Sequence, residues 1–451
     1  MRPGWRSRSG AAQRRRSKAS TDRRILRLAF PAFLALVAEP LYVLADTAVV
    51  GHLGTPQLAG LGVASSILLT GYSLFVFLAY GTTGTVARLL GSGDRAEAAR
   101  QAVQGLWLAL ALAVAVAILL FASAPGLVGA LGAEGAVRTN ALVYLRISVL
   151  GLPALFVTMA GTGYLRGQQD TRTPVVVAVA TAVFNLVVQL VLIEGFDQGI
   201  GASALATVLA QTGGAAVYLW RVVSSARALA VPLRPDLARV RRLAVVGRDL
   251  LVRTAALRVS LLAATAVATR IGTTDLAAHQ IAFELWSFLA LALDAVAIAG
   301  QSLTGYALGA GDAEGARAVG QRMLQWGLIA GVAFAAVVVA LRPWLPGIFT
   351  DDPGVRALAG FLLWWVAVLQ PVNGVAFVLD GILIGAGDLR YLAAAMVASM
   401  MAFLAAAGAV VLTGAGIGWL WAALAVLMGA RVATLLARFR TGAWAVTGAA
   451  R

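Results

Sequence analysis

The chain has 451 residues, of which 60% are hydrophobic and 12% are charged, and it contains no cysteine. A soluble chain of this length needs more charge to cover its surface, so the composition predicts a polytopic membrane protein and excludes disulfides and thiolate metal sites. The formal net charge of +16 gathers before Ile25 and in the segment 221–253, beside apolar runs. That distribution is typical of cytoplasmic loops and disfavours a nucleic-acid-binding surface.

In chain order, the sequence contains about twelve apolar runs that are each long enough to cross a bilayer. In the first half they are 26–50, 58–81, 101–124, 139–163, 174–193 and 200–221. In the second half they are 247–270, 276–301, 320–342, 355–383, 391–412 and 417–437. The prediction is therefore an all-α integral membrane fold of two parallel six-helix lobes.

An even number of crossings puts both termini on one side of the membrane, and the arginine-rich tail puts that side in the cytoplasm. We therefore expect a multi-pass protein of the cell inner (plasma) membrane. The polar composition of the tail predicts disorder there. The expected domains are a basic tail (1–24), a first lobe (25–223), a cytoplasmic linker (224–246), a second lobe (247–440) and a C-terminal tail (441–451).

The two halves of the chain repeat each other at a constant spacing. "HLGTPQLAGLGVA" at 52–64 returns as "RIGTTDLAAHQIA" at 270–282, and "LGSGD" at 90–94 returns as "LGAGD" at 308–312, both 218 residues later. Pro153 and Pro371 have the same offset. Each copy holds six predicted helices, so the copies have the same orientation, and parallel repeats of this kind build transporters.

Two carboxylates, Glu39 and Asp46, interrupt the first apolar run. They are seven residues apart, so they project from nearly the same face of a helix. An ionised carboxylate at bilayer depth costs about 2.5–3.5 kcal/mol, so this face is expected to point into a bundle or a wet cavity. Pro31 and Pro40 each remove a backbone hydrogen bond and are expected to bend the helix. Each carboxylate could be a protonation site or the partner of an arginine that locks two helices together; the residues leave both alternatives open.

At the repeat offset, Asp46 corresponds to Ala264 and Glu39 to Leu257, so these carboxylates belong to the first half alone. The second half has embedded charges of its own, which are candidates for a substrate cavity: Arg258, Glu284, Asp294 and Asp380. Arg258 is a plausible partner for Asp294, either in a structural ion pair or in a pair that contacts substrate. Two first-half arginines, Arg146 and Arg166, lie nearer the segment ends and are expected to snorkel toward the interface.

Other chemistries find little support in the sequence. There is no Walker A sequence, no nucleophile–base pair and no cluster of histidines and carboxylates at helical spacing, so we expect no enzyme, no cofactor and no metal site. "GSGD" and "GAGD" are interpreted as tight turns with helix-capping aspartates. His52 is expected at a helix end, and His279 is interpreted as an interfacial histidine or a weak polar contact to substrate.

The string "LAFPAFLALVAEPLYVLADTAVVGHLG", followed by twelve helices in two parallel sixes, resembles the multidrug and toxic compound extrusion (MATE) family. "YLRGQQDTRTPVVV" and "LDGILIGAGDLRYL" are similar to its DinF-like branch, and the resemblance covers residues from about 23 to 440. The family implies a MATE/MOP-type fold that exports organic, often cationic, compounds. Export in that family is driven by inward flow of protons or sodium ions.

The resemblance also implies a cation-coupling site in the first lobe. The family's first-helix aspartate falls on Asp46, its bending proline on Pro31, its fifth-helix asparagine on Asn185 and its sixth-helix threonine on Thr207. Gln189 stands where many relatives carry an acid. Asn185 and Gln189 share a helix face and could hydrogen-bond Asp46, but neither can release a proton. A cluster with one carboxylate binds sodium less readily, which favours protons as the coupling ion.

The resulting hypothesis is a secondary active exporter of small organic compounds that works by cation antiport, with Asp46 as a protonatable switch. Glu39 would be a second proton acceptor or an attractor for cationic substrate. We expect a monomer in the lipid bilayer with no nucleic-acid partner. The alternatives are a flippase for a lipid-linked precursor, sodium-coupled export of a metabolite, and a receptor or scaffold that transports nothing.

Overall fold

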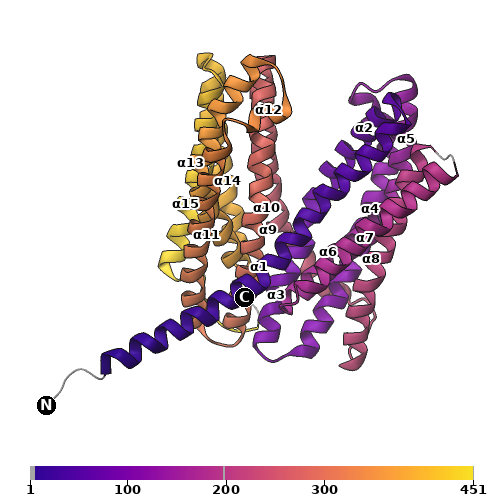
Figure 1. The fold of residues 1–451 in the computed structure, drawn as a ribbon. Helices are drawn as coiled ribbons and strands as arrows, with labels where there is room; N and C mark the ends of the chain where they lie inside the picture. The colour runs from indigo at the N-terminus through magenta and orange to yellow at the C-terminus, as the bar shows by residue number, and fades with distance from the viewer. Residues whose placement is uncertain (1–5, 197–198, 450–451) are drawn as a thin grey trace. The chain divides into compact units, whose positions relative to one another are not determined.

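The structure, a computed structural model, describes residues 6–196 and 199–449, and every element in those ranges is a helix (Figure 1). Contacts between the helices divide the chain into two compact units. The first-half unit comprises Leu34–Leu251, and the second-half unit comprises the described residues up to Phe33 together with those from Val252 onward. Helices α1 (Arg6–Leu53) and α9 (Leu237–Ile271) each contribute to both units.

The other helices each belong to one unit. Those of the first-half unit are α2 (Thr55–Ser73), η1 (Leu74–Val76), α3 (Phe77–Gly91), α4 (Arg95–Ala130), α5 (Gly135–Val149), α6 (Leu152–Gly167), α7 (Arg172–Leu190), the π-helix η2 (Val191–Gly195) and α8 (Ile200–Ala228). Those of the second-half unit are α10 (Thr273–Gly309), α11 (Ala313–Leu341), α12 (Leu345–Phe349), α13 (Pro353–Gly385), α14 (Leu389–Thr413) and α15 (Ile417–Thr441).

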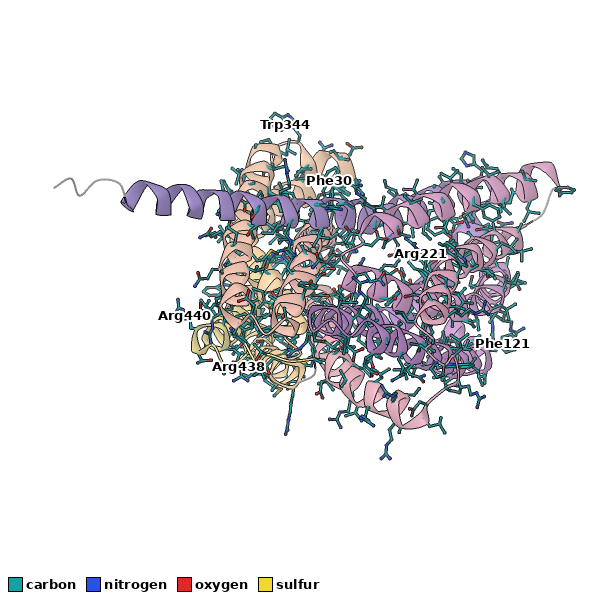
Figure 2. The ribbon with its side chains drawn as sticks, turned by 90° about the horizontal axis from the view of Figure 1, so that it is seen from below. Phe30, Phe121, Arg221, Trp344, Arg438 and Arg440 are labelled. Carbon is teal, nitrogen blue, oxygen red and sulfur yellow. The ribbon has the colours of Figure 1, made fainter. Side chains whose placement is uncertain are left out.

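The lengths and compositions of the helices confirm the predicted all-α membrane fold. Among the described residues, eleven helical segments are long and apolar enough to cross a membrane, and α5 with α6 makes a twelfth when this bent pair counts as one span. Large apolar side chains are exposed on the helices, such as Phe30 and Phe121, and in the turn before α12, where Trp344 lies (Figure 2). Such a surface is stable where lipid replaces water, so the helices carry an apolar exterior as well as an apolar core.

The predicted run 139–163 is two helices, α5 and α6, which meet at an angle of 49°. Pro153 lies in the first turn of α6 and has no N–H to continue the hydrogen bonding of α5. Its repeat equivalent, Pro371, lies inside the uninterrupted helix α13. A proline at this repeat position therefore permits a helix break without requiring one. The packing around it decides whether the helix breaks or continues.

Helix α1 begins at Arg6, inside the tail for which the composition predicts disorder, and it continues through Pro31 and Pro40 without a break. Asp22 is held by α11, because Arg322 donates to both of its carboxylate oxygens over 2.6 Å and Trp326 Nε1 donates over 2.9 Å. A bidentate guanidinium–carboxylate pair fixes orientation as well as distance. That clamp explains helical structure before residue 25, and the bending of α1 at its prolines stays a prediction.

The predicted linker 224–246 is mostly helical, because α8 ends at Ala228 and α9 begins at Leu237. The eight residues between them are fixed to α4. Gln104 Nε2 donates to the Arg234 carbonyl over 2.9 Å, and Trp107 Nε1 donates to the Leu233 carbonyl over 2.9 Å. The connection is therefore held against the first-half unit, with two of its carbonyl groups bonded by side chains of α4.

The predicted duplication recurs in the packing of both units. In the first-half unit, a Cβ atom on Gly163 would lie 2.5 Å from the carbonyl oxygen of Ala79. In the second-half unit, a Cβ atom on Gly381 would lie 2.3 Å from the carbonyl oxygen of Ala297. Both residues of the contact shift by the repeat offset. Such close backbone approach is the usual means of helix association in membranes, where helices gain nothing by withdrawing apolar surface from lipid.

Gly381→Ala is expected to destabilise the protein by about 3 kcal/mol, because the added methyl group meets a backbone carbonyl that cannot turn away. Gly408→Ala is the matched control, since nothing lies within 4 Å of the added atom. The measurement is the thermal unfolding temperature of the purified protein in detergent. Equal unfolding temperatures for the two variants would contradict a tight contact between α10 and α13.

Candidate functional site

Asp46 on α1 is the centre of a hydrogen-bonded cluster in the first-half unit, and its side chain is buried (5% exposed). Gln189 Nε2 of α7 and Ser203 Oγ of α8 donate to its Oδ1 over 2.7 and 2.6 Å. Tyr144 Oη of α5 donates to Oδ2 over 3.3 Å. None of the ion pairs among the described residues includes Asp46. Three neutral groups, and no arginine, therefore hold this carboxylate. We call Asp46, Tyr144, Gln189 and Ser203 the carboxylate cluster.

Asn185 and Thr207 lie beside the carboxylate cluster and are buried with it. Asn185 Nδ2 donates to Thr207 Oγ1 over 3.2 Å, and Thr207 Oγ1 in turn donates to the Ser203 carbonyl over 3.1 Å. The Thr207 hydroxyl also shares a 2.7 Å hydrogen bond with the Tyr42 hydroxyl. The structure thus brings together the residues that the sequence predicted, but of the two amides only Gln189 bonds Asp46 directly.

A cavity of about 310 Å³ lies in the first-half unit, between helices α1, α2, α3, α6, α7 and α8. Tyr42, Asn185 and Thr207 line it, whereas Asp46 does not. These three side chains therefore form a wall, one hydrogen-bonded layer thick, between the cavity and the carboxylate cluster. A volume of this size is enough for a small organic molecule.

Glu39 lines the same cavity, and its carboxylate accepts a hydrogen bond from Tyr72 Oη over 2.6 Å. Unlike Asp46, it is exposed. The two acids that the sequence placed on one helix face therefore have different environments. Pro31 and Pro40 are both half-buried on the same helix.

The four charged candidates of the second half are not gathered in one place. Asp380 is buried and forms ion pairs with Arg253 of α9 and Arg431 of α15. Arg258 and Glu284 are exposed, and Asp294 is half-buried. Asp294 acts electrostatically on the Arg431 guanidinium. The buried cluster therefore uses Arg253 and Arg431, two arginines that the sequence analysis did not select, and it ties α9, α13 and α15 together.

The sequence analysis also missed three first-half residues. Ser203 precedes Thr207 by one helical turn, which is the spacing that places two side chains on one face. No pattern in the sequence pointed to Tyr144 as a site residue. Arg166 was expected to snorkel, but it is buried and lines the cavity, whereas Arg146 is exposed and stacks on the Phe121 ring at 5.5 Å.

Neither histidine bonds a residue of the carboxylate cluster, and His279 belongs to the second-half unit. His52 at the end of α1 is within 2.7 Å of the Ala48 carbonyl oxygen. His279 is fully buried between the rings of Phe283 and Trp421, with centroids 5.7 and 5.8 Å away. His279 therefore packs in the second-half core, and its position at the membrane interface stays a prediction.

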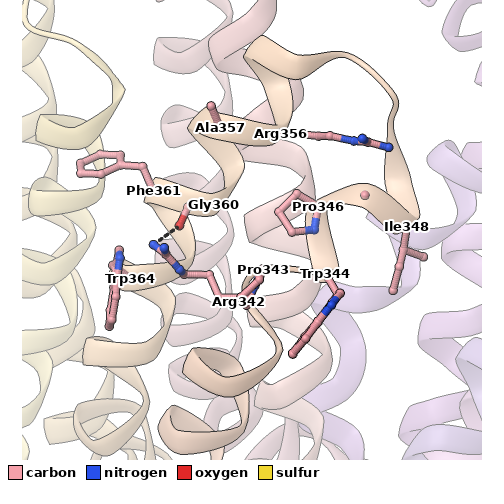
Figure 3. Close-up of a pocket in the computed structure, with 11 residues that line it drawn as sticks. Arg342, Pro343, Trp344, Pro346, Ile348, Arg356, Ala357, Gly360, Phe361 and Trp364 are labelled. Carbon is pink, nitrogen blue, oxygen red and sulfur yellow. Dashed lines mark hydrogen bonds between the residues drawn. The ribbon is translucent and has the colours of Figure 1, made fainter.

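A second pocket lies in the second-half unit around α12 (Figure 3). Arg342 stacks on Trp364 at 4.7 Å and donates to the Gly360 carbonyl over 3.2 Å. Arg356 is occupied by Asp351 and by the Thr350 carbonyl, each over 2.6 Å. The two guanidinium groups point to different sides, and both are bonded within the second-half unit.

A duplicated bundle of about twelve membrane-crossing helices, with a buried carboxylate beside a cavity, defines a polytopic membrane transporter. The MatE family model matches residues 31–191 and 250–411, so the chain belongs to the MATE family of multidrug and toxic compound transporters.

Relatives and solved structures agree with that assignment. Protein DETOXIFICATION 44, chloroplastic, of Arabidopsis thaliana is 34% identical over 93% of this chain and 83% of its own length. DNA damage-inducible protein F of Escherichia coli (strain K12) is 29% identical over 94% of each chain, which confirms the DinF-like resemblance. A crystal structure of MATE in the bent conformation has a TM-score of 0.85, with 21% identity over 94% of each chain.

Proposed function

We propose that this transporter exports small organic compounds by proton antiport, and that Asp46 is the group that binds the proton. The observation that carries the proposal is a buried carboxylate, held by neutral donors only, one layer of side chains away from a cavity. A buried charge with no cation beside it is costly, and protonation removes it. Ionised and protonated Asp46 can therefore favour different conformations of the protein, and this is how a coupled transporter links proton binding to transport.

The hydrogen bonds provide a route from the proton to the cavity. When Asp46 is ionised, the Ser203 hydroxyl donates to it. When Asp46 is protonated, the same hydroxyl can turn and accept, because a hydroxyl is both donor and acceptor. Ser203 is joined through its carbonyl to Thr207, and Thr207 is joined to Tyr42 in the cavity wall. We propose that a shift of Ser203 on protonation is passed to this wall through Thr207, because coupling requires that substrate and proton favour different states.

Protons are favoured over sodium ions by the donors around Asp46. Hard cations take several oxygen ligands. Here Gln189 turns its amide nitrogen toward the carboxylate, and Ser203 and Tyr144 direct hydroxyl hydrogens at it. Three donors already point at the carboxylate, and a sodium ion would need oxygen ligands in the places that these N–H and O–H groups take. The only species that the mechanism adds is therefore the proton, with no resident cofactor.

The distribution of arginines supports a plasma-membrane location with both termini in the cytoplasm. In this proposal the working unit is the monomer in a lipid bilayer, since the cavity is formed within the first-half unit of one chain. The cargo is a small organic molecule.

The test uses purified protein in proteoliposomes with a fluorescent cationic dye. Under an imposed pH gradient in sodium-free buffer, the dye is expected to move against its own gradient. The control applies a sodium gradient at equal pH on both sides. Dye movement driven by sodium alone would contradict the proposal and support the sodium-coupled alternative.

A further inference from the structure

The first-half cavity contains two charged residues of opposite sign. Of the residues that line it, only Glu39 and Arg166 carry a formal charge. Between them the walls are formed by tyrosines, threonines and aliphatic side chains, with Tyr218 and Met159 among them. A cargo that is only a cation would use one of the two charges and leave the other uncompensated.

Arg166 is unusual because it is buried, at 8% exposed, and faces a cavity. No ion pair found among residues 6–196 and 199–449 includes it. The acid nearest to Arg166 in sequence, Asp170, is already bonded to other residues. It accepts from the Thr173 hydroxyl over 2.6 Å and from Arg221 over 3.4 Å. A buried guanidinium without a carboxylate partner is costly, so an acidic ligand group would stabilise it.

The position of Arg166 is fixed by the packing of its helix. Gly167 and Gly163 of α6 lie against α3, where added Cβ atoms would come within 2.7 Å of Val86 and 2.5 Å of the Ala79 carbonyl. A helix seated this closely cannot rotate to take Arg166 away from the cavity. A guanidinium held in place presents a planar fork of donors, which matches a carboxylate, phosphate or sulfonate group.

We infer that Arg166 binds an acidic group of the transported compound, so that the cavity selects small amphoteric molecules whose basic group faces Glu39. This inference rests on the proposed function, because it takes the first-half cavity as the substrate site. It narrows the cargo from organic cations in general to molecules that carry both a basic and an acidic group.

The test compares two probes that differ only at the acidic group: a rhodamine dye with a free carboxylate, and the methyl ester of the same dye. Binding is measured by fluorescence polarisation in detergent, and transport is measured in proteoliposomes under a pH gradient. The wild type is expected to bind the carboxylate dye more tightly than the ester. Arg166→Gln is expected to weaken binding of the carboxylate dye by about 10- to 100-fold and to leave the ester unchanged, as for the loss of a charge-assisted hydrogen bond.

Two further variants control for folding. Arg166→Lys keeps the charge without the fork and should retain part of the preference. Arg146→Gln removes an exposed arginine on the neighbouring helix α5 and should behave as the wild type. A wild type with no preference between the dyes would overturn the inference, as would an equal loss for both dyes in Arg166→Gln.

The outcomes separate this inference from the proposed function. If the protein binds both dyes with equal affinity and a pH gradient moves both at equal rates, proton-driven export is supported and the acidic-group site is overturned. A second outcome is that the carboxylate dye binds in a way that depends on Arg166, but a pH gradient moves neither dye. That outcome overturns proton-driven export and supports the acidic-group site.

Discussion

Asp46→Asn is expected to lower proton-driven transport by about 100-fold while the protein stays folded. Asparagine has the same shape and keeps an acceptor oxygen for Gln189 and Ser203, which both donate to one oxygen of Asp46. Only the long Tyr144 contact of 3.3 Å meets the new amide nitrogen. The variant cannot exchange a proton, so the coupling free energy, of about 1–3 kcal/mol in typical coupled systems, is lost.

The measurement is the initial rate of dye movement in proteoliposomes under a pH gradient, with the unfolding temperature recorded for each variant. Asp94→Asn is the matched control. It makes the same substitution at an exposed residue that caps α4 by accepting from the Glu97 N–H over 2.8 Å. Asparagine caps helices as well as aspartate does, so this variant should transport normally. Undiminished transport by folded Asp46→Asn would show that the proton binds elsewhere.

Asp380→Asn is expected to destabilise the protein by about 3–5 kcal/mol, because it leaves two buried guanidinium groups without their shared carboxylate. Arg253 and Arg431 come from α9 and α15, so the loss of their partner loosens three helices together. The effect should appear as a lower unfolding temperature in detergent. Asp351→Asn breaks a surface pair with Arg356 and should leave that temperature unchanged.

Transport by the Asp380 variant distinguishes a structural ion cluster from a substrate contact. If the cluster only holds helices together, the protein that remains folded should transport at the wild-type rate per molecule. A variant that is as stable as the wild type but inactive would contradict the structural role. Asp380 would then return to the candidates for substrate or ion binding.

Several parts of the site could be predicted because membrane energetics makes them conspicuous. A carboxylate in an apolar run is costly, which singled out Asp46 before any neighbour was known. The helical repeat placed Gln189 on the same face as Asn185, and Gln189 is bonded to Asp46. Ser203 and Tyr144 could not be found this way, because serine and tyrosine hydroxyls cost far less in a membrane helix than a carboxylate does.

The second-half charges illustrate the limit of sequence reasoning. Arg253 and Arg258 are five residues apart on α9, so they lie on different faces of the helix. Which face turns inward depends on how α9 packs, and the structure buries Arg253 and exposes Arg258. The sequence contained both arginines but no information on the rotation of the helix.

Composition and periodicity along the chain were enough to predict the membrane class, about twelve crossings, the duplication and an embedded acid in the first half. These depend on composition, periodicity and a constant offset, all of which are properties of one chain read along its length. Three features became apparent once the helices were packed: Arg166 faces a cavity, Asp380 is shared by two arginines, and Pro153 lies at a helix break whereas Pro371 does not. Each of these depends on contacts between helices far apart in sequence, where close packing, and not local preference, sets the geometry.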